Sequence, residues 1–530
     1  MAQTLLIGLD GATYTVLNPL MEQGIMPFLK EFLARGAQGI LMSTAHPLTP
    51  PAFTSMYTGR SPGHHGILDF IHGTDEGEHV FFTLYDSRDV RCETIWSIAN
   101  RQNRKVTALN FVMTAPVTPV CGVVIPGMTH WKHLRRHSHP SSLYERLKAQ
   151  PWFDAKAMCW DFEHLEQATG NTPREEYAKW VTDHIARERQ WFQVLKFVMK
   201  KEPTDLVSIV FDGVDKIQHL CWEFLDPAIF PKNPEPWHLE IRELCYQYFR
   251  ELDAALKDIV TMAGPMSRVF IASDHGFGPV YWTIRLNQAL QELGYLAWKP
   301  GTVVEEKADE HKTLDLDWTK TVAYCPTLSG NGVFIRIADK PGKAGIKAEE
   351  YTAFRAKLAD QLKAKIVDPS TGKTLIKDVM FRETTFPGPA SHLAPDITIT
   401  ISDYSFVSTQ PGKSVAEKKE SVKGSHYPEG IFFAAGDGIK AGAKLDRMSI
   451  LDVAPAIIYS LGLPVPSNFE GKLPLAAFEP EFIAENPVEQ GAPAEEREDD
   501  SKASTETSGE KTKEEKDMVY DQLRALGYIE

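Results

Sequence analysis

The chain has 530 residues, of which 43% are hydrophobic and 24% are charged, so it can hold one large domain with insertions or two or three smaller domains. The formal net charge is −14, but residues 485–530 contain 14 acidic and 6 basic residues, which leaves a net charge of only −6 on the rest of the chain. A main body this close to charge balance gives no indication of a nucleic-acid polymer or a membrane surface as a partner.

The sequence begins with MAQTLLIGLD, which has no basic leader and an apolar run too short for a signal peptide. No apolar run approaches the roughly 18 residues that a membrane-spanning helix needs. The six cysteines are scattered without CxxC spacing, which indicates neither a disulfide framework nor a thiolate zinc site. We therefore expect a cytoplasmic protein with no membrane span.

Short apolar runs rich in β-branched residues alternate with longer helical patterns along the chain. The predicted strands are Thr4 to Leu9, Lys105 to Asn110, Leu206 to Phe211, Arg268 to Ala272 and Ile431 to Ala435, and the predicted helices include Glu175 to Met199 and Glu240 to Met262. Continuous apolar strands that alternate with helices are typical of a parallel sheet covered on both faces. The predicted fold class is therefore α/β, with a doubly wound, mostly parallel sheet and helices on both faces.

The chain is predicted to form one catalytic domain over residues 1–480, with cap insertions at about residues 67–200 and 300–420. After this domain, residues 485–516 are poor in apolar residues and rich in Glu, Ser, Thr and Lys, which predicts a disordered acidic linker. Residues 517–530 are predicted to form a C-terminal helix that docks on the body or on a partner of unknown identity.

The stretch HPLTPPAFTSMYTG, from His46 to Gly59, has two interpretations. In the first, Thr49 is the N-cap of a helix and Pro50 occupies the first helical position, where its missing N–H costs little. In the second, the same geometry aims the Thr49 hydroxyl toward an anion at the positive end of the helix. The two roles do not exclude each other.

Residues that bind metals lie next to four of the predicted strands. They are Asp10 in IGLDGA, Asp215 and His219 in VFDGVDKIQH, Asp274 and His275 in IASDHGFG, and His426 in GSHYPEG. The carboxyl ends of strands in an open parallel sheet converge on one crevice, so the three aspartates would reach the same place. Each residue alone has an ordinary alternative, because aspartates after strands often cap turns and single histidines are often satisfied within the fold.

Together these six side chains offer three carboxylates and three imidazoles without a thiolate. Such a set suits two divalent ions of the zinc or manganese kind better than calcium or a structural zinc. Two such ions roughly 4 Å apart can stabilise the attacking and the leaving oxygens of a phosphoryl transfer. Coordination to a dication would also activate the Thr49 hydroxyl, whose pKa is otherwise too high for a nucleophile.

The ordered blocks LDGA, PLTPPAFTSMYTGRSPGHHGILDF, FDGVDKIQH, SDHGFG, GSHYPEG and LDVAPAIIYSLGLPVPSNFEGK resemble the alkaline phosphatase superfamily, in its branch of type I phosphodiesterases and nucleotide pyrophosphatases. The resemblance implies an alkaline phosphatase-like fold with a threonine nucleophile, Thr49, and a phosphothreonine intermediate. It also implies that Asp215, His219 and His426 hold one metal ion and that Asp10, Asp274 and His275 hold the other.

Some positions differ from the family pattern and bear on the substrate. Nucleotide pyrophosphatases carry an asparagine at the end of the block HGILDF, where this chain has Phe70 after Asp69. The segment TPPAF also lacks the CxPxR motif of sulfatases. The block from Thr94 to Gly127 resembles cytoplasmic phosphohydrolases or phosphomutases, and Asn110 within it follows a strand. Asp69, Phe70 and Asn110 are therefore candidate substrate-binding residues.

The sequence thus predicts a metal-dependent hydrolase of phosphoric esters, and a phosphodiesterase in particular. A phosphomutase or a phosphomonoesterase of the same superfamily is the alternative within enzymes, and a metal-stabilised binding or scaffold protein is the alternative outside them. The expected cofactors are two divalent ions, Zn²⁺ or Mn²⁺, and the expected ligand is a phosphate ester.

Overall fold

A central sheet of eight strands organises the computed structural model, which describes residues 3–75, 80–159, 172–301, 316–327, 329–340 and 342–497. In spatial order the strands are β17 (Met448–Ser449), β2 (Ala37–Met42), β16 (Glu429–Gly436), β8 (Arg268–Ala272), β1 (Thr4–Leu9), β7 (Leu206–Phe211), β5 (Val106–Leu109) and β6 (Gly122–Ile125). Strand β16 is antiparallel to β2 and β8, and the other neighbouring pairs are parallel. The predicted α/β class with a mostly parallel sheet is confirmed.

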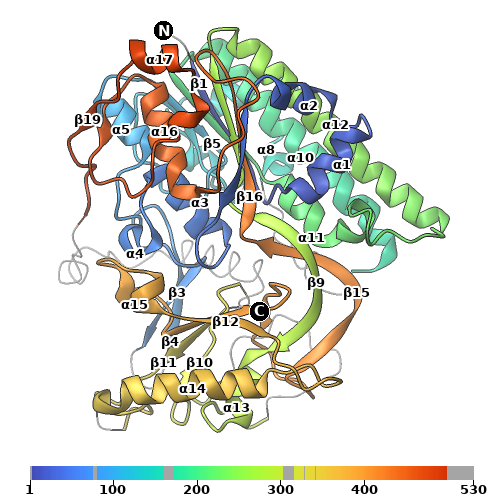
Figure 1. Cartoon of the computed structure of the whole chain (residues 1–530), viewed down its shortest axis with the longest axis vertical. Helices are drawn as coiled ribbons and strands as arrows, with labels where there is room; N and C mark the ends of the chain where they lie inside the picture. The colour runs from blue at the N-terminus through green and yellow to red at the C-terminus, as the bar shows by residue number, and fades with distance from the viewer. Residues whose placement is uncertain are drawn as a thin grey trace.

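Helices cover both faces of this sheet (Figure 1). On one face lie α1 (Tyr14–Glu22), α2 (Pro27–Ala34), α6 (Leu134–His137), α7 (Leu143–Lys148), α8 (Ala155–Met158), α10 (Arg174–Lys201), α11 (Gly213–Leu225) and α12 (Pro236–Ala263). On the other face lie α3 (Thr49–Thr58), α5 (Ile95–Arg101) and α16 (Val453–Ser460). Successive side chains of β1 point to opposite faces of the sheet, so Leu5 and Ile7 pack in the hydrophobic core on the first face and Leu6 packs in the core on the second.

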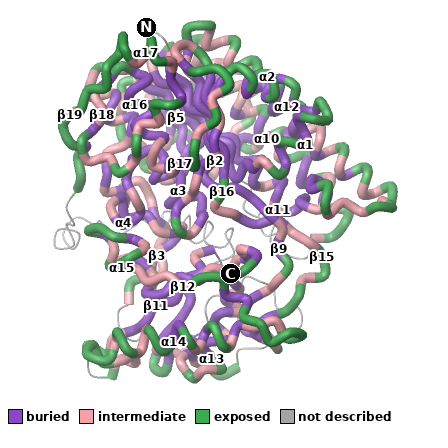
Figure 2. Tube along the Cα trace, viewed as in Figure 1, coloured by how far each residue is buried: buried purple, intermediate pink, exposed green. Residues whose placement is uncertain are grey.

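A small lobe with its own hydrophobic core lies below the main body in Figure 1. It contains the sheet β10 (Ala323–Tyr324), β11 (Gly332–Ile335), β13 (Ile397–Ile401) and β12 (Ile376–Phe381), with α13 (Leu286–Glu292), α14 (Tyr351–Lys365) and α15 (Arg382–Thr385). The long antiparallel strands β9 (Gly276–Arg285) and β15 (Ala416–Tyr427) join the lobe to the body, and β14 (Val407–Ser408) pairs with β9. Figure 2 shows buried residues in both parts.

The first predicted cap, at residues 67–200, differs from the structure. Strands β5 and β6 and helix α10 lie within that range, yet they belong to the central sheet and its covering layer. The hairpin of β3 (Ile71–Asp75) and β4 (Val80–Leu84) reaches the small lobe, where Val80 joins the core. Strands of only four residues in an aromatic-rich region have too short a hydrophobic pattern for the sequence to distinguish strands of the central sheet from an insertion. The second predicted insertion, residues 300–420, lies largely in the small lobe.

The beginning of the predicted acidic linker packs on the body. Helix α17 (Pro480–Glu485) is followed by β19 (Gln490–Gly491), which pairs with β18 (Val465–Pro466). The amide of Asn468 exchanges hydrogen bonds with the backbone of Ala494, and Arg60 pairs with Glu496 at 2.9 Å. The rest of the linker and the predicted helix at 517–530 lie outside the described residues.

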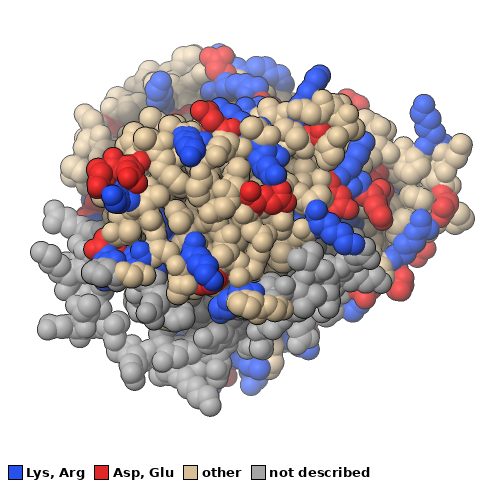
Figure 3. Space-filling model, turned by 90° about the horizontal axis from the view of Figure 1, so that it is seen from below, with Lys and Arg blue, Asp and Glu red and all other residues tan. Residues whose placement is uncertain are grey.

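The helices and the charged surface of the described residues agree with the composition of the sequence. Within the described ranges, no helix is both long and apolar enough to cross a membrane. The face shown in Figure 3 carries Lys and Arg side chains mixed with Asp and Glu side chains, as expected from the near-balanced charge of the main body.

Asp253 on α12 fixes the start of α2, and this contact yields a first prediction. The carboxylate accepts the backbone N–H groups of Phe28 at 2.9 Å and Leu29 at 2.8 Å, in a buried position. Asp253→Ala would leave both N–H groups without a partner, so we expect the free energy of unfolding to fall by about 2–4 kcal/mol in urea denaturation. The exposed Asp258 on the same helix is the control, and Asp258→Ala should change stability by less than about 0.5 kcal/mol. Equal effects of the two substitutions would contradict this assignment.

Candidate active site

Three adjacent strands bring the predicted metal ligands to one edge of the sheet. Asp10 follows β1 directly, Asp274 and His275 follow β8, and Asp215 and His219 lie in the first two turns of α11, just after β7. His426 lies just before β16, next to the fourth predicted strand, and it is itself part of β15, where it pairs with Phe277 of β9. The arm that carries the small lobe therefore delivers the last of the six side chains.

The six side chains form two groups, and in each group the ligand atoms lie within 4.8 Å of one another. In the first group, Asp215 Oδ1 lies 3.4 Å from His219 Nε2 and 3.0 Å from His426 Nε2. In the second group, His275 Nε2 lies 3.5 Å from Asp10 Oδ1 and 3.2 Å from Asp274 Oδ2. The rings of His275 and His426 stack with their centroids 3.6 Å apart, so the two groups are direct neighbours.

The three ligand histidines all turn Nε2 toward the carboxylates and Nδ1 toward a backbone carbonyl. Nδ1 of His219 contacts the Gly424 carbonyl at 3.2 Å, Nδ1 of His275 the Gly276 carbonyl at 3.0 Å, and Nδ1 of His426 the Pro47 carbonyl at 3.0 Å. A carbonyl only accepts hydrogen bonds, so each Nδ1 carries a proton, and in a neutral ring Nε2 then carries a lone pair. Burial lowers the pKa of His275 and His426, which keeps these rings neutral.

The carboxylates of the second group are electrostatically unfavourable without a cation. Burial, reinforced by the neighbouring carboxylates, raises the pKa of Asp10 well above its usual range, and burial raises the pKa of Asp274. Burial would also raise the pKa of Asp215, but the Lys216 ammonium and His219 outweigh it and hold that pKa well below its usual range. The two groups therefore differ in the charge that their carboxyls carry.

The donor set fits a pair of divalent metal ions. Asp10 Oδ1, Asp215 Oδ1 and Asp274 Oδ2 are buried and have no hydrogen-bond partner, and these are the oxygens that approach the histidine Nε2 atoms. An ionised carboxylate oxygen and an unprotonated imidazole nitrogen that face each other at 3.0–3.5 Å repel unless a proton or a metal ion lies between them. Imidazole nitrogens and carboxylate oxygens without thiolates suit ions such as Zn²⁺ and Mn²⁺.

Thr49 lies beside the second group and makes no helix cap. It is the first residue of α3, its hydroxyl lies 3.3 Å from His275 Nε2, and only 7% of the residue is exposed. The core holds the helix in place, because Phe53 packs against the backbone at Gly8 and edge-on to Phe111. Of the two sequence interpretations, the geometry therefore favours a hydroxyl that faces the metal ligands.

The three candidate substrate-binding residues make hydrogen bonds within the fold. Asp69 is nearly buried, and its carboxylate accepts hydrogen bonds from Thr327 Oγ1 at 2.6 Å and from Ser329 Oγ at 3.0 Å, both in the small lobe. Phe70 follows it, and its backbone N–H donates to the same carboxylate at 2.6 Å. Asn110 donates its amide to the Val210 carbonyl at 2.9 Å, which joins the ends of β5 and β7. These contacts anchor the walls of the site.

Three residues near the ligands were not predicted as site residues from the sequence. Lys216 lies beside Asp215, with Nζ 2.9 Å from Asp215 Oδ2. Phe406 of the small lobe packs against His426 with centroids 4.8 Å apart, and His46 packs against Phe406 at 5.9 Å. Phe406 lies in a loop without a recognisable motif, so the sequence held no signal for it.

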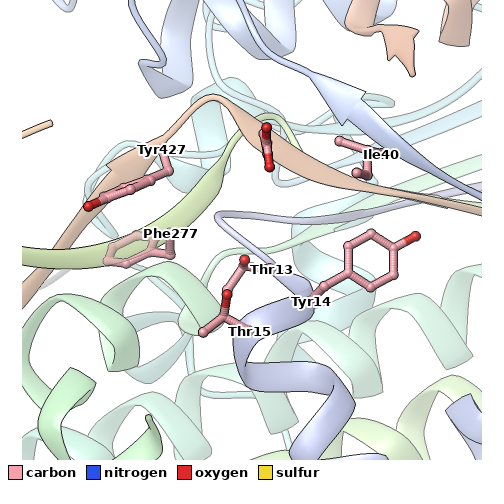
Figure 4. A pocket seen from close by; sticks show the side chains of 7 residues that line it. Thr13, Tyr14, Thr15, Ile40, Phe277 and Tyr427 are labelled. Atoms are coloured by element: carbon pink, nitrogen blue, oxygen red, sulfur yellow. The ribbon is translucent and has the colours of Figure 1, made fainter. Parts of the chain in front are cut away.

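A separate cavity of about 360 Å³ lies beside the start of β9 and the end of β15 (Figure 4). Its lining residues are Thr13, Tyr14, Thr15, Ile40, Phe277, Tyr427 and Glu429. Phe277 belongs both to this cavity and to the ligand site, where its ring packs on His219 with centroids 4.8 Å apart. None of the six predicted ligands lines the cavity.

Comparisons with known proteins agree with this geometry. The family model described as type I phosphodiesterase/nucleotide pyrophosphatase matches residues 4–428. No curated protein matches the sequence significantly. Among solved structures, murine ectonucleotide pyrophosphatase/phosphodiesterase 5, inactive and in complex with AMP, is 13% identical with a TM-score of 0.51, covering 90% of this chain and 100% of that one. Phosphonoacetate hydrolase from Sinorhizobium meliloti in complex with phosphonoformate is 16% identical with a TM-score of 0.50, covering 87% and 95%. At these identities the two structures support the fold.

Metal binding to the metal-free protein should release protons. Burial raises the pKa of Asp274 to about 8, so this carboxyl holds a proton at pH 7, whereas metal ligands must be deprotonated; the pKa of Asp10 is raised in the same direction. We expect titration calorimetry with Zn²⁺ at pH 7, in buffers of different ionisation enthalpy, to show release of at least about one proton per protein and an affinity that rises with pH. A binding enthalpy that does not depend on the buffer would show that these carboxyls are already ionised.

Asp69 should make the stability of the protein depend on pH. Burial raises its pKa to about 6, against the hydrogen bonds that it accepts, so the folded protein binds this proton more tightly than the unfolded chain. The contribution is present at low pH and is lost as pH rises from about 4 to 6. Compared with Asp69→Asn, the wild type should lose about 3 kcal/mol of unfolding free energy over this window in denaturant titrations. A difference that stays constant, or that grows with pH, would refute the assignment.

Proposed function

This chain belongs to the type I phosphodiesterase/nucleotide pyrophosphatase family, hydrolases of phosphoric ester bonds, and from that premise we propose that it is a phosphodiesterase with Thr49 as nucleophile and two divalent ions as cofactors. The observation that carries the proposal is the position of the Thr49 hydroxyl. It lies 3.3 Å from His275 Nε2, at the start of a helix and beside two groups of buried ligands.

The two groups would hold one ion each. Asp215, His219 and His426 would hold the first, and Asp10, Asp274 and His275 would hold the second. When bound, such ions supply positive charge for the attacking and the leaving oxygens of a phosphoryl transfer, and the donor set favours Zn²⁺ or Mn²⁺.

The protein's own contribution begins with Thr49. Pro50 and Pro51 restrict the backbone of the first helical turn, so Oγ1 is presented in a fixed direction at the positive end of α3. We propose that Oγ1 attacks phosphorus in line with the leaving alcohol. The Oγ1–P bond forms as the P–O bond to the leaving alcohol breaks. The hydroxyl proton of Thr49 departs with that alcohol, and Thr49 is left as a phosphate ester that still carries the second alcohol of the diester. Water then hydrolyses this ester and restores the threonine hydroxyl.

Burial of the reacting groups supports this sequence of steps. Thr49, His275 and the three aspartates are nearly inaccessible, so the charges that act on phosphorus lie in a region of low dielectric, where each is stronger than in water. The small lobe closes one side of the site through Phe406, which packs on His426.

The two similar structures agree with the proposed substrate class. The murine protein is described as an inactive threonine-to-alanine variant that binds AMP, and the bacterial protein binds phosphonoformate. Phosphate esters and phosphonates share a tetrahedral phosphorus with anionic oxygens. For this chain we propose a phosphate ester and name no nucleotide, because Phe70 stands where the family's asparagine would donate to the phosphoryl group.

Substitution of Thr49 tests the proposed nucleophile. With bis(p-nitrophenyl) phosphate and added Zn²⁺ or Mn²⁺, Thr49→Ala should lower kcat on the order of a thousandfold or more, because no other group replaces the covalent step. Thr49→Ser keeps a hydroxyl at the same place and should retain measurable turnover. Metal content, measured after gel filtration, should be unchanged in both variants.

Wild-type turnover by Thr49→Ala, at full metal content, would show that another group attacks phosphorus. The reaction type is tested separately in ¹⁸O-labelled water. Hydrolysis places the label in the phosphorus-containing product. Unlabelled product with the phosphoryl group on a second hydroxyl of the substrate would indicate a phosphomutase instead.

A further inference from the structure

We propose that Lys216 is a positioning residue of this centre, holding one oxygen of Asp215 so that the other stays directed between His219 and His426. The inference rests on the proposed function only in taking these three residues as metal ligands. It concerns how this chain prepares one of the two ligand groups before any metal or substrate arrives.

The two oxygens of the Asp215 carboxylate have different partners. Oδ2 lies 2.9 Å from Lys216 Nζ, and Oδ1 lies 3.0 Å from His426 Nε2 and 3.4 Å from His219 Nε2. A charge-assisted hydrogen bond at this distance fixes the rotation of the carboxylate about its Cβ–Cγ bond. Oδ1 therefore points at the two imidazole lone pairs and has no hydrogen-bond partner of its own.

The backbone that carries Lys216 is held from α10 at three points. Trp180 Nε1 donates to the Lys216 carbonyl at 3.1 Å, and Glu188 accepts the Gly213 N–H at 2.6 Å. Arg187 pairs with Asp212, just before α11 begins, and both side chains are nearly buried. The first turn of α11 is thus fixed in place, and the lysine side chain folds back toward the neighbouring carboxylate.

Lys216 contacts only one of the two ligand groups directly. Its side chain is 14% exposed, and its ion pair is with Asp215. Asp10 of the second group is affected through its charge, with no ion pair to Lys216 among the contacts of the described residues. A positioning role therefore predicts an effect on one metal and not on the other.

A pure charge effect predicts the opposite sign. Lys216 is a cation close to two dications, so its removal would reduce repulsion and tighten the binding of metal. Loss of orientation at Asp215 would weaken binding, as outer contacts to metal ligands typically contribute tenfold to a hundredfold in metal affinity. The direction of the change separates the two explanations.

The test compares Lys216→Met, Lys216→Gln and Lys216→Arg in the full chain, by titration calorimetry of the metal-free protein with Zn²⁺. We expect the wild type to bind two equivalents. Lys216→Met should weaken one equivalent by about tenfold to a hundredfold and leave the other within about threefold. Lys216→Gln, which keeps a hydrogen-bond donor without the charge, should lie between Met and the wild type, and Lys216→Arg should lie closest to the wild type.

Lys343 in the small lobe provides the matched control. Its side chain is 10% exposed, and its Nζ lies 3.3 Å from Asp75 and 3.0 Å from Asp339. Lys343→Met removes a comparably buried ion pair far from the ligands in the fold, so it should bind both equivalents as the wild type does. Circular dichroism identifies any variant that fails to fold. If Lys216→Met does not fold, the comparison of Lys216→Gln and Lys216→Arg with the wild type still tests the proposal.

Co²⁺ supplies a second measurement that reports ligand geometry. Its visible absorption depends on coordination, so displacement of Asp215 should change the band of one bound Co²⁺ in Lys216→Met. Unchanged or tighter binding of both equivalents, or equal weakening of both, would overturn the proposal. These measurements need no substrate. The expected loss of metal affinity does not depend on whether Thr49 is the nucleophile. If Lys216 does not orient Asp215, this loss would be absent even in an active enzyme.

Discussion

The structure depends on the close approach of three carboxylates and three imidazole lone pairs inside the protein. Without a cation, such an arrangement is costly, because three buried carboxyls this close together cannot all stay ionised, and the pKa values of Asp10 and Asp274 are raised accordingly. The fold tolerates it by fixing each group from outside. Backbone carbonyls hold the three Nδ1–H groups, and Lys216 holds one oxygen of Asp215. Dications would convert this repulsion into coordination, which is why the arrangement indicates a metal centre rather than a structural polar cluster.

The sheet order explains how residues so distant in sequence meet. Strands β8, β1 and β7 are neighbours, and each ends at the same edge, so Asp274, Asp10 and Asp215 converge without special loops. The small-lobe arm completes the set, because β15 returns antiparallel to β9 and brings His426 over His275. The ring stack between these two histidines ties the first ligand group to the second. A shift of either strand of the arm would therefore disturb both groups.

The sequence could predict whatever depends on local pattern. Strand Thr4–Leu9 and the ends of β7 and β8 were marked by continuous apolar runs, and an aspartate at each end identified the crevice. The route of His426 could not be predicted, because it depends on the pairing of β15 with β9 across more than a hundred residues. Asn110 follows a strand and was therefore predicted to face the crevice. Its amide instead donates a hydrogen bond to the Val210 carbonyl, a contact that forms only because β5 and β7 are adjacent. Lys216 was visible beside Asp215 but carried no pattern, since neighbouring positions on a helix point in different directions.

In the proposed function, the reacting groups and most of the surrounding contacts come from different parts of the fold. The residues that we propose to act on phosphorus come mainly from the ends of the central strands and the helices that follow them, whose positions are set by the main core. The walls of the site come from the small lobe, through Phe406 and through Thr327 and Ser329, which bind the Asp69 carboxylate. Phe406 contacts the ligands His426 and His219, whereas Thr327 and Ser329 contact Asp69, which is not a ligand. Changes in the lobe can therefore alter which alcohol is accepted while the two ligand groups keep their geometry. If the proposed function holds, this division would let one metal centre serve substrates that share only the phosphoryl group.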